Sequence, residues 1–256
     1  MESPGARLIL LGASNLTRDL PAVLEIARRR LEAAPLQVVA AAGHGRCYGT
    51  ASRVLLRQLP SILECGLWSA LGKTSHRPTY ALLTDIGNDL MQECPAARIA
   101  GWIEACAERL EPVGARVVIS TLPEKTLSRL RPWQFLLFRT LLYPGRRLGL
   151  AELRRRAAEL NRRLRELCAR RNLRCIEPDP DWFGADAIHL RRGARKRAWE
   201  TLLGDWEITV TRGGGRSREP VPRRRLVPQC RSILGRELRR AQPCAVLGDG
   251  TTVSLF

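Results

Sequence analysis

Four short segments carry side chains whose order along the chain suits nucleophilic catalysis. Taken singly, they are a helix cap, a glycine turn, a second cap and a surface turn. Taken together, they supply a serine nucleophile, an imidazole base, a carboxylate that orients the base, and donors for an oxyanion. The segments are Gly12-Ala13-Ser14-Asn15, Gly43-His44-Gly45, Asp85-Ile86-Gly87-Asn88-Asp89 and Asp186-Ala187-Ile188-His189.

The last segment provides the expected acid–base pair. Serine is a weak nucleophile at neutral pH, so we expect His189 to take the Ser14 proton as general base. Asp186 precedes His189 by three residues, close enough to accept its other ring N–H and set the tautomer. His44 is a rival base. It lacks a carboxylate at that spacing, so the alternative role for it is to line the substrate pocket.

These segments follow short apolar runs that alternate with amphipathic stretches. Strands are predicted over residues 7–12, 36–42, 80–84, 115–120 and 173–176, and helices over 15–33, 52–65, 95–110, 150–171 and 193–205. This alternation is typical of an α/β protein with a parallel sheet and helices on both faces. Ligands of such sheets bind beyond the carboxyl ends of the strands, which is where the polar segments fall.

At this point the chain resembles the SGNH (GDSL-type) hydrolase superfamily over roughly residues 6–205. The resemblance rests on Ser14, Gly45 (or Gly43), Asn88 and the Asp186/His189 pair, in the family's order. Ala13 stands where the family has Asp before the serine, and Gly87 directly precedes Asn88.

That resemblance implies a three-layer α/β/α fold of flavodoxin-like type with a five-stranded parallel sheet. It also implies hydrolysis of an ester or thioester through an acyl-enzyme on Ser14, without a metal or other cofactor. It assigns the oxyanion donors to the backbone N–H groups of Ser14 and Gly45 and the side-chain amide of Asn88.

Residues 128–149 are richer in aromatic side chains than the rest of the chain. They form either a helix packed on the sheet or a lid over the site, and the sequence leaves both open. In the second case Trp133, Phe135, Phe138 and Tyr143 could meet an apolar substrate group. The candidate pocket residues are thus Trp133 and Phe138 of this segment, and His44.

The formal net charge of +18 is concentrated in two segments. Of the 43 basic residues, 40 are arginine; residues 128–171 carry 13 Arg against 3 Glu, and residues 212–256 carry 10 Arg against 3 acidic residues. We expect the helix over 150–171 to be a solvated face, although it could attract an anionic surface. An alternative function is therefore a non-catalytic basic protein that binds nucleic acid or an anionic surface on the same scaffold.

The chain is expected to comprise a hydrolase-like domain over residues 1–211 and a basic Gly/Pro/Arg-rich tail over 212–256. The tail should contribute little to the core, although Val246 and residues 253–256 could add a late strand. Without a signal-peptide pattern or an apolar run near the roughly 20 residues of a membrane span, we expect a cytoplasmic protein whose eight cysteines are free thiols.

Overall fold

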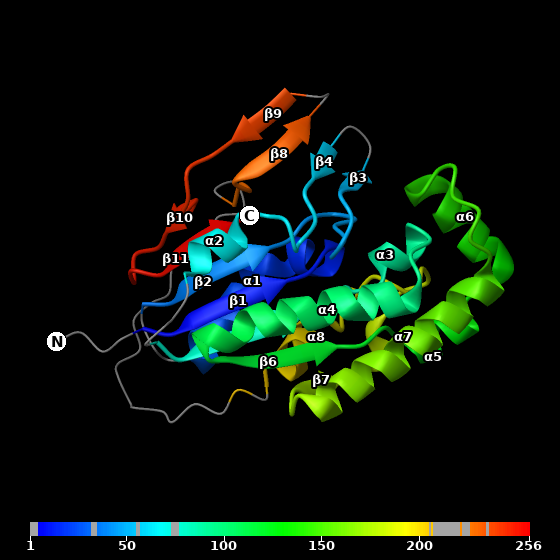
Figure 1. Ribbon diagram of the computed structural model, residues 1–256, viewed down its shortest axis with the longest axis horizontal. Helices are drawn as coiled ribbons and strands as arrows, with labels where there is room; N and C mark the ends of the chain where they lie inside the picture. The colour runs from blue at the N-terminus through cyan, green and yellow to red at the C-terminus, as the bar shows by residue number, and fades with distance from the viewer. Residues whose placement is uncertain are drawn as a thin grey trace.

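The predicted strands lie side by side in one sheet of the computed structural model (Figure 1). The structure describes residues 5–31, 35–54, 57–72, 77–204, 226–233 and 236–256, with Trp206 and Val221. Its strand order is β10-β11-β2-β1-β5-β6-β7. The five predicted strands are neighbours and parallel: β1 (Arg7–Leu11), β2 (Gln37–Ala41), β5 (Thr79–Leu83), β6 (Ala115–Ser120) and β7 (Arg174–Ile176).

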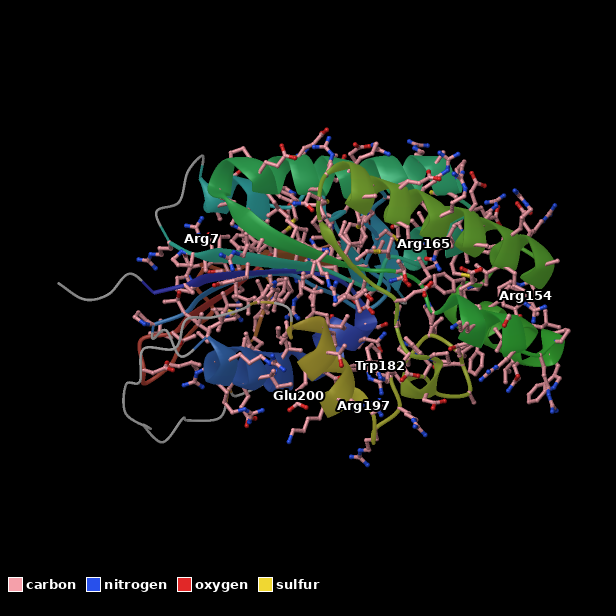
Figure 2. The ribbon with its side chains drawn as sticks, turned by 90° about the horizontal axis from the view of Figure 1, so that it is seen from below. Arg7, Arg154, Arg165, Trp182, Arg197 and Glu200 are labelled. Carbon is pink, nitrogen blue, oxygen red and sulfur yellow. The ribbon has the colours of Figure 1, made fainter. Side chains whose placement is uncertain are left out.

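Helices cover both faces of this sheet, so the predicted three-layer α/β/α fold is confirmed. In Figure 2 the sheet runs between α4 and α7 on one side and α1 and α8 on the other. Alternate strand residues explain the layers: Ile9 packs with the α4/α7 core, whereas Leu8 and Leu10 pack with the α1/α8 core. The helices are α1 (Ser14–Arg30), α2 (Leu67–Leu71), α3 (Asn88–Met91), α4 (Ala96–Leu110), α5 (Glu124–Arg129), α6 (Pro132–Leu142), α7 (Leu150–Arg170) and α8 (Arg195–Leu202).

The strand register places three of the polar segments at one level of the sheet. Leu11 pairs with Ala41 on one side and with Leu83 on the other, so β1, β2 and β5 end together. The residues that follow these strands therefore meet at the carboxyl edge, as expected for a parallel sheet.

A second sheet replaces the helix predicted over residues 52–65. Four antiparallel strands pair in the order β3-β4-β8-β9. They are β3 (Ser52–Val54), β4 (Arg57–Leu59), β8 (Cys230–Ile233) and β9 (Arg236–Arg239). The helix prediction was wrong because β4 pairs with β8, more than 170 residues away in sequence, and local periodicity carries no information about such a partner.

The end of the chain contributes to the main sheet. Strand β11 (Thr252–Leu255) pairs in parallel with β2, and β10 (Ala245–Val246) pairs antiparallel with β11. Val253 is fully buried and Phe256 nearly so. The late strand is thus present, and the tail does not lie wholly outside the domain; its residues 212–220 and 222–225 lie outside the described part of the chain.

Within the described residues, no helix is both long and apolar enough to span a membrane. All eight cysteines are free thiols, as predicted.

Candidate active site

Ser14, His189 and Asp186 come together in one hydrogen-bonded row. The Ser14 Oγ lies 3.0 Å from His189 Nε2, and His189 Nδ1 lies 2.6 Å from Asp186 Oδ2. Because Asp186 accepts a hydrogen bond from the Nδ1–H group, the lone pair of Nε2 faces the serine hydroxyl. The three side chains therefore have the arrangement that serine activation requires.

A tight turn holds Asp186 against His189. Asp186 Oδ1 accepts the backbone N–H of Ile188 at 3.2 Å and that of His189 at 2.9 Å. Ala187, which directly follows Asp186, has φ 62°, a left-handed conformation that costs a residue with a Cβ about 1–2 kcal/mol. Burial would raise the pKa of Asp186, but the hydrogen bonds and the charge of His189 outweigh it, so the pKa is lowered. The carboxylate form is thereby favoured.

Asp85 organises the first turn of α1, which begins at Ser14. Its Oδ2 accepts the backbone N–H groups of Ala13 at 3.0 Å, Asn15 at 3.0 Å and Leu16 at 3.1 Å. The N–H of Ser14 has no acceptor among the described residues. One carboxylate thus satisfies the amides on both sides of Ser14, whereas the Ser14 N–H remains available as a donor.

Asn15 ties this turn to the segment that carries His189. Its Nδ2 donates to Asp85 Oδ1 at 2.8 Å and to the Ile188 carbonyl at 2.9 Å. Its Oδ1 accepts the Leu190 N–H at 2.9 Å. The sequence suggested only a helix cap for Asn15 and assigned no role to Asp85. The signal that was missed is their position directly beside Ser14 and at the end of β5.

The second and third segments also interlock. Asn88 Nδ2 donates to the Arg46 carbonyl at 2.9 Å, next to Gly45, whose φ of 65° is one that glycine adopts without strain. Buried Asp89 accepts the N–H of Tyr48 at 2.7 Å and the Thr50 hydroxyl at 3.2 Å. Burial raises the pKa of Asp89, although these hydrogen bonds oppose the rise. Asp89 therefore anchors the loop that contains Gly45, and Asn88 contacts that loop directly.

Tyr143, just beyond α6, reaches the same amide. Its hydroxyl donates to Asn88 Oδ1 at 2.8 Å, and burial raises its pKa above the ordinary value. With Oδ1 accepting from Tyr143, the amide nitrogen of Asn88 is directed toward the Gly45 loop.

A cavity of about 120 Å³ adjoins Ser14 and Asn88. Its walls include apolar side chains of α5, α6 and α7, among them Leu127, Phe138 and Leu153. Such a cavity suits an apolar substrate group.

The predicted pocket residues are placed differently from one another. Phe138 lines the cavity. Trp133 lies on the outer face of α6, 60% exposed, because Phe135 and Phe138 already occupy the inward face at helical spacing. His44 is exposed at the tip of its turn and is not among the cavity walls. Cys47 is buried, and burial raises the pKa of its thiol.

No model of a known protein family matches the chain, and no curated protein sequence matches it significantly. Solved structures are similar to the chain in fold. The native aryl esterase of M. smegmatis is 15% identical, with a TM-score of 0.53 over 78% of this chain and 97% of that one. Its inhibitor-bound form is 16% identical, with a TM-score of 0.52 over the same shares. The chain has the fold of the SGNH hydrolases.

In this SGNH fold, Ala13 replaces the acidic residue that usually precedes the serine. A carboxylate is nevertheless present beside the serine turn, because Asp85 reaches it from the end of β5. Asp85 itself has φ 56°, a left-handed conformation that Asp tolerates better than most residues.

The basic helix of this SGNH fold is largely neutralised. Glutamates of α7 pair with Arg155, Arg156, Arg162 and Arg163, and Glu104 pairs with Arg170 and Arg171. These ion pairs lie on the face of α7 that was expected to be solvated.

Proposed function

We propose that this chain is a serine hydrolase that cleaves a carboxylic ester or thioester through an acyl-enzyme on Ser14. The observation that carries the proposal is the 3.0 Å approach of Ser14 Oγ to His189 Nε2, with Asp186 on the other ring nitrogen. The esterases among its structural neighbours agree with this chemistry.

In the first step, Ser14 Oγ attacks the acyl carbon while His189 Nε2 takes the hydroxyl proton. Asp186 stabilises the imidazolium that forms. As the tetrahedral intermediate collapses, the bond to the alcohol or thiol breaks, and His189 returns the proton to that leaving group. The acyl group remains bonded to Ser14.

The oxyanion is stabilised by preorganised donors. The free N–H of Ser14 is one, and the Gly45 N–H and the second Nδ2 hydrogen of Asn88 are the others. Each such donor typically contributes about 3 kcal/mol to transition-state stabilisation.

In the second half-reaction, water attacks the acyl carbon and His189 accepts its proton. As the resulting tetrahedral intermediate collapses, the bond between the acyl carbon and Ser14 Oγ breaks and His189 gives its proton to Oγ, which releases the carboxylic acid and regenerates the Ser14 hydroxyl. We place the acyl group in the apolar cavity beneath α6, where Phe138 and Leu127 provide contact.

The decisive experiment is labelling with a fluorophosphonate probe, followed by mapping of the modified residue. Wild type should be labelled at Ser14 and should hydrolyse p-nitrophenyl acetate. Ser14→Ala should lose labelling and at least about 10⁴-fold in kcat/KM. Ser128→Ala, which removes an exposed serine, is the control and should behave as wild type. Labelling at another residue, or none in a folded protein, would contradict the proposal.

The alternative, a basic protein that binds nucleic acid, predicts a different result. Its affinity for duplex DNA would fall steeply between 50 and 200 mM salt, on the order of 10³-fold, and would be unchanged by Ser14→Ala. The ion pairing of α7 leaves fewer unpaired cations for such a surface.

A further inference from the structure

Helix α6 carries an exposed apolar face beside the cavity. Four of its side chains are largely exposed: Trp133 at 60%, Leu136 at 52%, Leu137 at 57% and Leu141 at 71%. Figure 1 shows α6 at the edge of the molecule, farther from the central sheet than α3. Clusters of large exposed apolar side chains on one element mark a surface that binds something apolar.

The helix is apolar on its other side as well. Phe135 is buried and Phe138 lines the cavity. Its one charged residue, Arg139, turns back to the protein, where it donates to the Leu148 carbonyl at 3.0 Å. A helix that is apolar all round requires an apolar environment on both sides. Among the residues that the structure describes, the protein covers the inner side only.

Cations flank the exposed face at both ends of the helix. Lys125, Arg129 and Arg131 precede it, Arg146 and Arg147 follow it, and all five are exposed. None of their side chains forms a salt bridge among the described residues; Arg146 donates to the neutral amide of Gln92, and the nearby carboxylate of Glu93 accepts the backbone N–H of Arg147. Residues 124–147 contain six basic residues and one acidic residue. The apolar face therefore has a positively charged border.

The positive charge of this border indicates which kind of partner binds the apolar face of α6. A second copy of the chain, docked symmetrically through α6, would bring five cations against five. A lipid surface with anionic headgroups supplies both the apolar interior and the opposite charge, and tryptophan is favoured where the two meet.

We propose that the outer face of α6, with its basic border, docks on an anionic lipid surface. The helix inserts its leucines and Trp133 among the acyl chains, while the flanking arginines contact phosphate groups. Arg154 of α7 (Figure 2) donates hydrogen bonds to the carbonyls of Leu127, Ser128 and Leu130. These bonds fix the end of α5, just before α6, to α7. Docking there brings the cavity next to the membrane. This binding does not depend on the proposed hydrolysis.

Co-sedimentation with vesicles tests the proposal. The full-length protein is mixed with large unilamellar vesicles of phosphatidylcholine alone or with 30% phosphatidylglycerol. We expect binding to the anionic vesicles at least about ten-fold tighter than to the neutral ones. The double variant Leu137→Ser/Leu141→Ser should lose about ten-fold or more. Its control is Val246→Ser, at an equally exposed valine on β10, which should bind as wild type.

A second pair of variants tests the charge. Arg129→Gln/Arg131→Gln should weaken binding to the anionic vesicles about ten-fold and reduce its salt dependence. The matched control is Arg236→Gln/Arg240→Gln, which removes two exposed cations near the second sheet. Thermal melting of each variant checks that it is folded.

The proposal is wrong if wild type does not bind anionic vesicles, or if Leu137→Ser/Leu141→Ser binds them as tightly as wild type does. It is also wrong if sedimentation velocity shows a dimer that Leu137→Ser/Leu141→Ser dissociates while its vesicle binding is unchanged. Hydrolysis of water-soluble p-nitrophenyl acetate is measured in parallel. If wild type binds vesicles but hydrolyses nothing, the proposed function fails and the docking surface stands.

Discussion

Asn15 accepts a hydrogen bond from the backbone N–H of Leu190 at 2.9 Å, although the two residues are 175 positions apart in sequence. On the other side of His189, Asn15 donates to the Ile188 carbonyl at 2.9 Å. One side chain thus holds the backbone on both sides of His189. Since Asn15 directly follows Ser14, this contact sets the distance between the serine and the imidazole.

Asn15→Ala should separate Ser14 from His189. A displacement of about 1 Å at a reacting pair costs about 100-fold, and we expect a loss of that size in kcat/KM for p-nitrophenyl acetate. The matched control is Asn161→Ala, because Asn161 is equally enclosed and bonds the Leu122 backbone at 2.8 and 3.0 Å. Both variants should lose about 2 kcal/mol of unfolding free energy. Equal activity losses would contradict a positioning role for Asn15.

Asp85→Asn should weaken the first turn of α1. The amide has one oxygen to replace two, and its NH₂ group would face either backbone N–H groups or Asn15 Nδ2. We expect unfolding free energy to fall by about 2 kcal/mol in urea denaturation at pH 7, with a fall in kcat as the Ser14 N–H loses its fixed direction. Asp179→Asn, at the cap of a short helix, should cost less. An unchanged urea midpoint would remove the organising role that we assign to Asp85.

Tyr143→Phe tests the orientation of the Asn88 amide. Without the phenolic hydroxyl, Asn88 Oδ1 loses its donor and the amide can rotate away from the oxyanion. We expect kcat to fall about ten-fold while KM changes little, because the interaction matters most in the transition state. Tyr80→Phe is the control, since Tyr80 packs against Trp206 away from the site. A change confined to KM would indicate that Tyr143 only shapes the cavity.

Acid should remove the stabilising effect of Asp186. Its pKa is lowered in the folded protein, so the folded state favours the carboxylate. That contribution is fully present above the unfolded-state pKa of about 3.9 and is lost as pH falls through the lower folded-state value. The difference in unfolding free energy between wild type and Asp186→Asn should therefore shrink as pH falls below about 4. Urea denaturation across this range measures it, and a difference that grows in acid would contradict the lowered pKa.

Strand β11 should be required for stability. Val253→Ala removes two methyl groups from a fully buried position, and we expect a loss of about 2 kcal/mol in unfolding free energy. Val246→Ala, the same change at a 58% exposed position on the adjacent strand, should stay within about 0.5 kcal/mol of wild type. If the two variants unfold alike, β11 does not belong to the cooperative core.

The sequence predicted the five neighbouring parallel strands because each is a short apolar run between turn residues, and that signal is local. It also predicted that Ser14 and the Asp186/His189 pair would face one another, because parallel strands bring their carboxyl ends to one edge. It missed β3, β4 and the pairing of β11 with β2, since each depends on a partner far away in sequence. The helix predicted over residues 52–65 failed for this reason.

Residue identity and strand periodicity are enough to predict the types of chemical groups and the edge of the sheet at which they gather. Tertiary packing selects the carboxylate that holds the turn at Ser14, the amide that spans His189, and the hydroxyl that orients Asn88. Asp85, Asn15 and Tyr143 act through hydrogen bonds of about 3 Å between segments 55 to 175 residues apart. Such directional contacts leave no periodic pattern in the chain, because they depend on how the layers pack and not on the spacing of residues.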